Sequence, residues 1–162
     1  MTFSVTYHWR CIRVLVIALM LTLNMHSAAA VDMPLVSVEG DKTNLNQYQG
    51  KWVVVNYWAT WCVPCLEELP HLQAFHDDHA DVDAIVIGIN KEKIGAERLH
   101  EFLETYFISY PVFVSKPREK SSLGVVPGLP TSFLISPQGE MVKRRIGPVT
   151  REMLEGFIAN QE

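Results

Sequence analysis

Residues 52–65 read WVVVNYWATWCVPC. The first seven are almost all β-branched or aromatic, which predicts a strand buried on both faces of a sheet. Two cysteines, Cys62 and Cys65, follow at once and are separated by two residues. Pro64 between them favours the first turn of a helix, because its missing N–H would have no helical partner there. The stretch therefore predicts a strand, a cysteine pair and a helix in that order.

The remainder of the chain predicts an α/β domain around this strand. Apolar runs predict further strands at 31–38, 82–89, 112–114, 131–135 and 141–146, the last two joined by the turn Ser136-Pro137-Gln138-Gly139. Helical periodicity continues from Cys62 to about His79, where Pro70 predicts a kink. Two more helices are indicated by the apolar sets Leu99, Phe102, Leu103, Tyr106 and Met153, Leu154, Phe157, Ile158. This pattern predicts a central mixed β-sheet flanked by helices on both faces.

Length and composition limit the class of protein. A chain of 162 residues suits one domain and is too short for two full cores. Hydrophobic residues at 48% and charged residues at 20% are typical of a globular protein and exclude a disordered one. The net charge of −4 gives no reason to expect nucleic acid as a partner, since such proteins usually carry a basic face.

Residues 1–30 predict a secretory signal peptide. Their only two charged side chains, both arginines, precede an apolar run from Val14 to Leu23, and a run of small residues follows. This order is what a signal peptide requires, and it predicts cleavage before Val31 and a mature domain over 31–162. In a Gram-negative host the product would be periplasmic. The alternative is an uncleaved membrane anchor, although the apolar segment is shorter than the ~20 residues that span a bilayer.

Without that segment the chain keeps only Cys62 and Cys65, because Cys11 is removed. A disulfide between residues three apart restricts the unfolded chain little, since the stabilisation grows with loop length. The pair therefore indicates chemistry or metal binding. A structural zinc site needs four ligands, and no second cysteine pair is present to supply them. We predict neither metal nor cofactor, and a copper(I)-binding module that uses both cysteines and a histidine stays as the alternative.

The helix that follows the cysteines predicts their separate roles. At a helix N-terminus, the partial positive charge and free N–H groups favour the thiolate of Cys62 over its thiol. A thiolate is the species that attacks a disulfide, so Cys62 is the expected nucleophile. Cys65, one turn later, would resolve the mixed disulfide and release the product.

The sequence YWATWCVPC at residues 57–65, together with Gly128-Leu129-Pro130-Thr131, resembles the thioredoxin superfamily. More narrowly, it is similar to exported TlpA/ResA/CcmG-type thiol-disulfide oxidoreductases, and the resemblance covers Pro34 to Ile158. It implies a thioredoxin-like fold, protein thiols and disulfides as substrates, a net reducing direction and a membrane electron donor for re-reduction. Cytochrome c maturation and general disulfide repair would both fit. A disulfide oxidase or isomerase of the same fold is the alternative.

The resemblance also implies a substrate-binding loop. Pro130 corresponds to the family's cis-proline, and Leu129 would offer its backbone to an extended substrate. Thr131 completes this loop. Trp61 would shield the disulfide and form part of the docking surface.

A buried acid is the last residue that the resemblance implies. Thioredoxin carries an aspartate six residues before its nucleophile, whereas this chain has Asn56, which cannot titrate. The TlpA/ResA type instead has a glutamate three residues after the second cysteine, which is Glu68 here. That spacing puts Glu68 on the same side of the helix as Cys65, where partial burial would suit it to acid–base catalysis. The alternative is that Glu68, like Glu67, only stabilises the start of the helix.

Overall fold

The computed structural model describes residues 30–115 and 121–160. The predicted signal peptide therefore lies outside the described residues, apart from Ala30. Within the described ranges, no helix is both long enough and apolar enough to cross a membrane.

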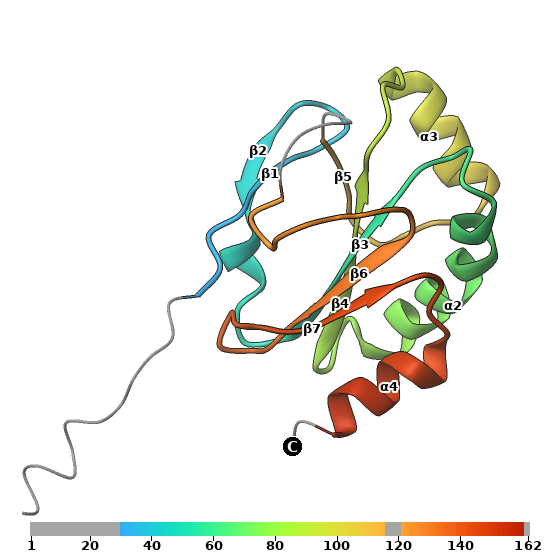
Figure 1. Ribbon diagram of the computed structural model, residues 1–162. Coiled ribbons are helices and arrows are strands. Elements are labelled where there is room, and N and C mark those ends of the chain that lie inside the picture. The colour runs from blue at the N-terminus through green and yellow to red at the C-terminus, as the bar shows by residue number, and fades with distance from the viewer. Residues whose placement is uncertain (1–29, 116–120, 161–162) are drawn as a thin grey trace, which may run out of the picture.

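A five-stranded sheet forms the centre of the domain, with strand order β5-β4-β3-β6-β7 (Figure 1). The middle strand β3 (Trp52–Trp58) runs parallel to β4 (Ala84–Asn90), which in turn runs parallel to β5 (Val112–Val114). On its other side β3 pairs antiparallel with β6 (Thr131–Ile135), and β6 with β7 (Met141–Ile146). All seven residues of β3 are buried. The predicted mixed sheet and its fully buried central strand are confirmed.

Three α-helices cover one face of this sheet: α2 (Val63–His79), α3 (Ala96–Thr105) and α4 (Arg151–Ala159). They bury Leu72, Leu99 and Leu154 in one hydrophobic cluster, and Figure 1 shows all three on the same side. The chain steps from β3 to β4 to β5 in one direction, so two right-handed crossovers place α2 and α3 on the same face. We call this the helix-covered face.

The opposite face is covered by smaller elements. Strands β1 (Pro34–Val36) and β2 (Lys42–Asn44) form an antiparallel pair, and the 3-10 helix η1 (Leu45–Tyr48) follows. Leu35 and Leu45 from these elements share a second core cluster with Val53, Val55 and Tyr57 of β3. The sheet is therefore covered on both faces, but the prediction of helices on both is wrong for the α-helices, because the crossovers place α2 and α3 on the same face as α4 and, among the described elements, only the short 3-10 helix η1 lies on the other. We call this second side the hairpin-covered face.

Some predicted boundaries shift by a few residues. The strand expected over 82–89 begins at Ala84, because Val82 lies in the turn after α2 and is 73% exposed. Tyr106 and Met153, expected on apolar helix faces, are 41% and 38% exposed. Pro70 lies inside α2, and the helix continues through it.

Candidate active site

The cysteine pair lies where the chain passes from β3 into α2. Cys62 is the N-cap residue of α2, and its carbonyl accepts hydrogen bonds from the backbone N–H groups of Cys65, at 2.9 Å, and Leu66, at 3.1 Å. Pro64 occupies the first turn, as predicted. The two sulfurs are bonded, with an S–S distance of 2.13 Å. Cys62 is 5% exposed and Cys65 is fully buried, so Cys62 is the more accessible sulfur to a partner.

The loop before Cys62 is held by a residue that sequence reasoning missed. Glu92, just after β4, accepts hydrogen bonds from the backbone N–H of Thr60 at 3.0 Å and from its hydroxyl at 3.1 Å. The side-chain amide of Asn90, which is fully buried, donates to the same carboxylate at 3.0 Å. These contacts fix the backbone two residues before the N-terminal cysteine. Only the fold brings positions 60 and 92 together, so no local pattern could have revealed the pair.

Apolar side chains flank the disulfide at the surface. Trp61 is 67% exposed and Val63 is 65% exposed. Exposed apolar side chains that gather at one place mark a site of interaction. Trp58, by contrast, is fully buried against Phe102 with ring centroids 5.4 Å apart, which confirms its predicted place in the core.

The Leu129–Pro130 peptide bond is cis, as predicted. Thr131 pairs with Tyr57 in the antiparallel register, so this loop lies at the same end of the sheet as the loop that carries Cys62. Leu129 is partly buried and Pro130 is buried. Thr131, predicted to bind substrate, is also fully buried, and its hydroxyl donates to the carbonyl of Gly128 at 2.7 Å. Its side chain therefore points into the core and stabilises the loop through this hydrogen bond.

Glu68 lies in α2 three residues after Cys65 and is 1% exposed. Its Oε1 accepts from the side-chain amide of Asn56 at 2.8 Å, and its Oε2 accepts from the backbone N–H of Val149 at 2.9 Å. Burial raises the pKa of Glu68 to about 7, and these two hydrogen bonds oppose that rise. Near neutral pH both protonation states are populated, as acid–base catalysis requires. The adjacent Glu67 is exposed, so the two glutamates have different environments.

Several buried polar atoms around this acid have no partner. Among the described residues such atoms include Asn56 Oδ1, Trp58 Nε1 and Tyr110 Oη, all on the helix-covered face. Gly88, opposite Asn56 on β4, makes room for two of these side chains. A Cβ at Gly88 would lie 2.9 Å from Trp58 Nε1 and 3.2 Å from the Tyr110 ring. Buried polar groups without partners are costly and uncommon, so their concentration here sets this region apart.

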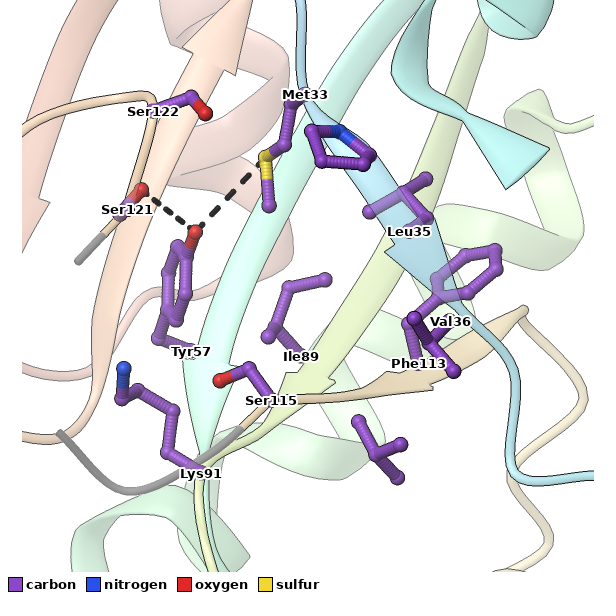
Figure 2. Close-up of a pocket in the computed structure, with 12 residues that line it drawn as sticks. Met33, Leu35, Val36, Tyr57, Ile89, Lys91, Phe113, Ser115, Ser121 and Ser122 are labelled. Carbon is purple, nitrogen blue, oxygen red and sulfur yellow. Dashed lines mark hydrogen bonds between the residues drawn. The ribbon is translucent and has the colours of Figure 1, made fainter. Parts of the chain in front are cut away.

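A separate cavity of about 120 Å³ lies on the hairpin-covered face (Figure 2). Its walls include the apolar side chains of Leu35, Ile89 and Phe113. Inside it, the Tyr57 hydroxyl lies 2.7 Å from Ser121 Oγ and 3.9 Å from Met33 Sδ. Because Tyr57 points away from α2, this cavity is not part of the cysteine site. No group of three or more His, Cys, Asp or Glu side chains in the described ranges is placed to hold a metal ion.

The chain is similar to known proteins over most of its length. The AhpC/TSA family matches residues 26–144. The thiol-disulfide oxidoreductase ResA of Halalkalibacterium halodurans is 31% identical over 131 residues, which cover 80% of this chain and 73% of that protein. ResA of Bacillus subtilis is also 31% identical over 131 residues, covering 80% of this chain and 72% of that protein.

Solved structures agree with this fold. StoA from Bacillus subtilis aligns with a TM-score of 0.66 and 26% identity, over 81% of this chain and 98% of that one. A thiol:disulfide interchange protein of the thioredoxin family from Chlorobium tepidum gives 0.70 and 26%, over 81% and 93%. A secreted thiol-disulfide isomerase from Corynebacterium glutamicum gives 0.72 and 26%, over 77% and 80%.

Proposed function

The chain belongs to the AhpC/TSA family of thioredoxin-like proteins and is a thiol-disulfide oxidoreductase; we propose that it is exported and works as a protein disulfide reductase. One observation carries this proposal. The bonded pair Cys62–Cys65 opens α2 at the same end of the sheet as the cis peptide bond before Pro130. A nucleophilic sulfur therefore lies beside a loop that suits an extended polypeptide.

The proposed reaction moves two electrons to the substrate in two exchanges. In the reduced protein, the Cys62 thiolate attacks one sulfur of a substrate disulfide, and the other substrate sulfur leaves as a thiolate that takes up a proton. Cys65 then attacks Cys62 Sγ, which breaks the mixed disulfide and releases the second substrate thiol. The protein is left with the Cys62–Cys65 bond that the structure contains. A thiol donor, which we propose to be membrane-bound, must reduce this bond before the next turnover.

Glu68 is the proposed base of the second exchange. Cys65 is fully buried, so its thiol needs a nearby group to accept the proton before it can attack. Glu68 lies one helical turn away, and its pKa of about 7 lets it accept that proton near neutral pH and release it afterwards.

The proposed substrate site combines an exposed apolar side chain with the loop that precedes β6. Trp61 offers exposed apolar area beside the nucleophile, and Leu129, which precedes the cis peptide bond to Pro130, presents its backbone to a substrate strand. Thr131 supports this site indirectly through its hydrogen bond to Gly128.

Export is proposed from the order of residues in the first thirty positions, which is that of a secretory signal peptide. One structural relative is described as secreted, and the proposal extends that location to this chain. In a Gram-negative host, the protein would act in the periplasm.

Trapping tests the proposed reaction. The variant Cys65→Ser cannot complete the second exchange, so we expect it to accumulate mixed disulfides with substrate proteins through Cys62. The matched variant Cys62→Ser should trap none, although it also carries one cysteine of the pair. If neither variant forms mixed disulfides and the reduced protein binds copper(I) in a tight 1:1 complex, the chain is a metal carrier and the proposal is wrong.

A further inference from the structure

One oxygen of the buried Glu68 carboxylate is linked, through hydrogen bonds of Asn56, to the strand that begins after the cis-proline. The side-chain nitrogen of Asn56 donates to Glu68 Oε1 at 2.8 Å and to Ser132 Oγ at 3.0 Å. A primary amide has two N–H donors, and these two bonds use both. Ser132 lies in β6, two residues after Pro130, and is 4% exposed.

The second oxygen is linked to the carbonyl of the cis-proline through the backbone segment from Gly147 to Val149. The backbone N–H of Val149 donates to Glu68 Oε2 at 2.9 Å. Two residues earlier, the backbone N–H of Gly147 donates to the carbonyl oxygen of Pro130, also at 2.9 Å. Val149 is 1% exposed, and Thr150 caps the N-terminus of α4, so this short segment is anchored in the core.

These four hydrogen bonds close into a ring, because Pro130 and Ser132 lie together where β6 begins and Gly147 and Val149 lie together in the segment between β7 and α4. We name it the Glu68 ring, and its members are Asn56, Glu68, Pro130, Ser132, Gly147 and Val149. Sequence reasoning found Glu68 and Pro130 separately. It had no means of finding the connection, since two of the four bonds are made by backbone N–H groups.

We propose that the Glu68 ring couples the substrate-docking loop to the acid–base group, with Ser132 and Gly147 as positioning residues that act on Glu68 through Asn56 and Val149. This inference rests on the proposed reductase reaction. N–H donors stabilise the ionised carboxylate and oppose the effect of burial. Gly147 is half-buried and the other ring members are buried, including Asn56 and Val149, whose N–H groups donate to Glu68, so water does not replace either donor when it moves away. A substrate strand that displaces the loop at Pro130 therefore changes the proton affinity of Glu68, and by linkage the protonation of Glu68 changes how the loop binds.

Few other titratable groups act on Glu68. Tyr110, from the segment before β5, interacts with it electrostatically, and burial together with this carboxylate raises the pKa of Tyr110. Cys65 lies one turn earlier on α2. The neighbouring strands β3 and β6 contribute the uncharged Asn56 and Ser132, and the segment before α4 contributes only a backbone N–H. The hydrogen-bond donors of the Glu68 ring are therefore the groups that we expect to control the protonation of Glu68.

A matched pair of glycine variants tests the coupling. Gly147 and Gly40 both have φ +94°, and a Cβ at either position would meet nothing within 4 Å. Gly147→Ala and Gly40→Ala therefore add the same backbone strain, but only the first alters the ring. We expect Gly147→Ala to weaken the Val149 donor and raise the pKa of Glu68 by about one unit. Gly40→Ala should leave it unchanged. The measurement is NMR titration of ¹³C-labelled glutamate in the reduced full chain.

A second pair of variants tests the coupling independently, in case Gly147→Ala does not fold. Ser132→Ala removes the acceptor that orients Asn56, and we expect the pKa of Glu68 to rise by about half a unit. The control Ser136→Ala removes a hydroxyl of similar burial from the residue directly after β6. The midpoint of the pH profile for disulfide exchange should move with the titration in both ring variants.

The outcomes separate this inference from the proposed function. If Gly147→Ala and Ser132→Ala titrate like their controls while the parent protein reduces protein disulfides, the coupling is wrong and the function stands. A parent protein that shows no exchange would instead remove the proposed function and this inference with it, even if the ring variants shift Glu68.

Discussion

The two faces of the central sheet differ in how they treat buried polar groups. Strand β3 shows the contrast residue by residue, since Asn56 and Trp58 point to the helix-covered face and Val55 and Tyr57 to the other. On the helix-covered face both Asn56 and Trp58 leave a buried polar atom without a partner. On the hairpin-covered face the Tyr57 hydroxyl is hydrogen-bonded to Ser121 (Figure 2), and among the described residues Ser115 Oγ is the one buried polar atom there without a partner.

The two faces therefore differ in how much folding stability they lose to buried polar groups. Burying a carboxylate and leaving polar atoms unpaired both reduce stability. The helix-covered face contains the buried carboxylate, three of the unpartnered atoms and the disulfide, whereas among the described residues the hairpin-covered face has one unpartnered atom, Ser115 Oγ, and no buried carboxylate. We conclude that redox chemistry is concentrated on one face and that the other mainly contributes stability. Four substitutions test this division between the two faces.

Loss of the nucleophile should have the largest effect. Cys62→Ser removes the attacking thiolate, so we expect disulfide exchange to fall by about 10³-fold or more, measured as reduction of a disulfide-bonded protein. Val53→Ala, on the hairpin-covered side of β3, is the control. It should destabilise the protein but keep the parent rate per folded molecule. A comparable loss of rate in Val53→Ala would contradict the division between the faces.

Truncation under the hairpin should affect stability alone. Leu35 is 2% exposed in the second core cluster, so Leu35→Ala should lower the free energy of unfolding by about 3 to 4 kcal/mol through lost burial and a new cavity. Denaturant titration measures this change. The reduction potential of the cysteine pair should stay at the parent value. A shifted potential would show that the hairpin-covered face also controls the redox site.

The buried carboxylate should make stability depend on pH. Burial raises the pKa of Glu68 from 4.5 to about 7, so between these values the folded protein keeps a proton that the unfolded chain releases. The free energy of unfolding therefore falls as pH rises through this window, by up to about 3 kcal/mol. Glu68→Gln cannot titrate and should lack this decline when denaturation at pH 5 and 8 is compared. The exposed neighbour supplies the control, as Glu67→Gln should retain the parent slope.

Substitution of an exposed residue with a strained backbone should have the smallest effect. Phe107 follows α3 with φ +54° and is 84% exposed. Glycine is favoured in this position at the end of a helix, so Phe107→Gly should raise the free energy of unfolding by about 1 kcal/mol at most. Exchange activity should not change. Thermal and denaturant unfolding would check this, and a destabilised variant would mean that the exposed ring makes a contribution we have not identified.

The sequence predicted the parts of the site that depend on short patterns. An apolar run followed by two cysteines and a proline was enough to place β3, the N-cap cysteine and α2. Spacing of three residues placed Glu68 beside Cys65, and resemblance identified the cis bond at Pro130. These features are local, or are signalled by one distinctive residue.

The missed parts depend on contacts between distant segments. Glu92 contacts Thr60 from the segment after β4, and Gly147 and Val149 act through backbone N–H groups that any residue but proline has. Thr131 belongs to the expected loop, but only the register of β6 shows that its side chain points inward. Side-chain direction at the end of a strand follows from pairing, which a single sequence does not state.

The proposed direction of electron transfer can be tested by the reduction potential of the Cys62–Cys65 couple, because this potential decides whether the protein reduces substrate disulfides or forms them. The full chain would be equilibrated across dithiothreitol or glutathione buffers and the thiol fraction measured. A reductase should give a value near the roughly −270 mV of thioredoxin, or lower. A value near the roughly −120 mV of a strong disulfide donor would contradict the proposed direction and identify an oxidase.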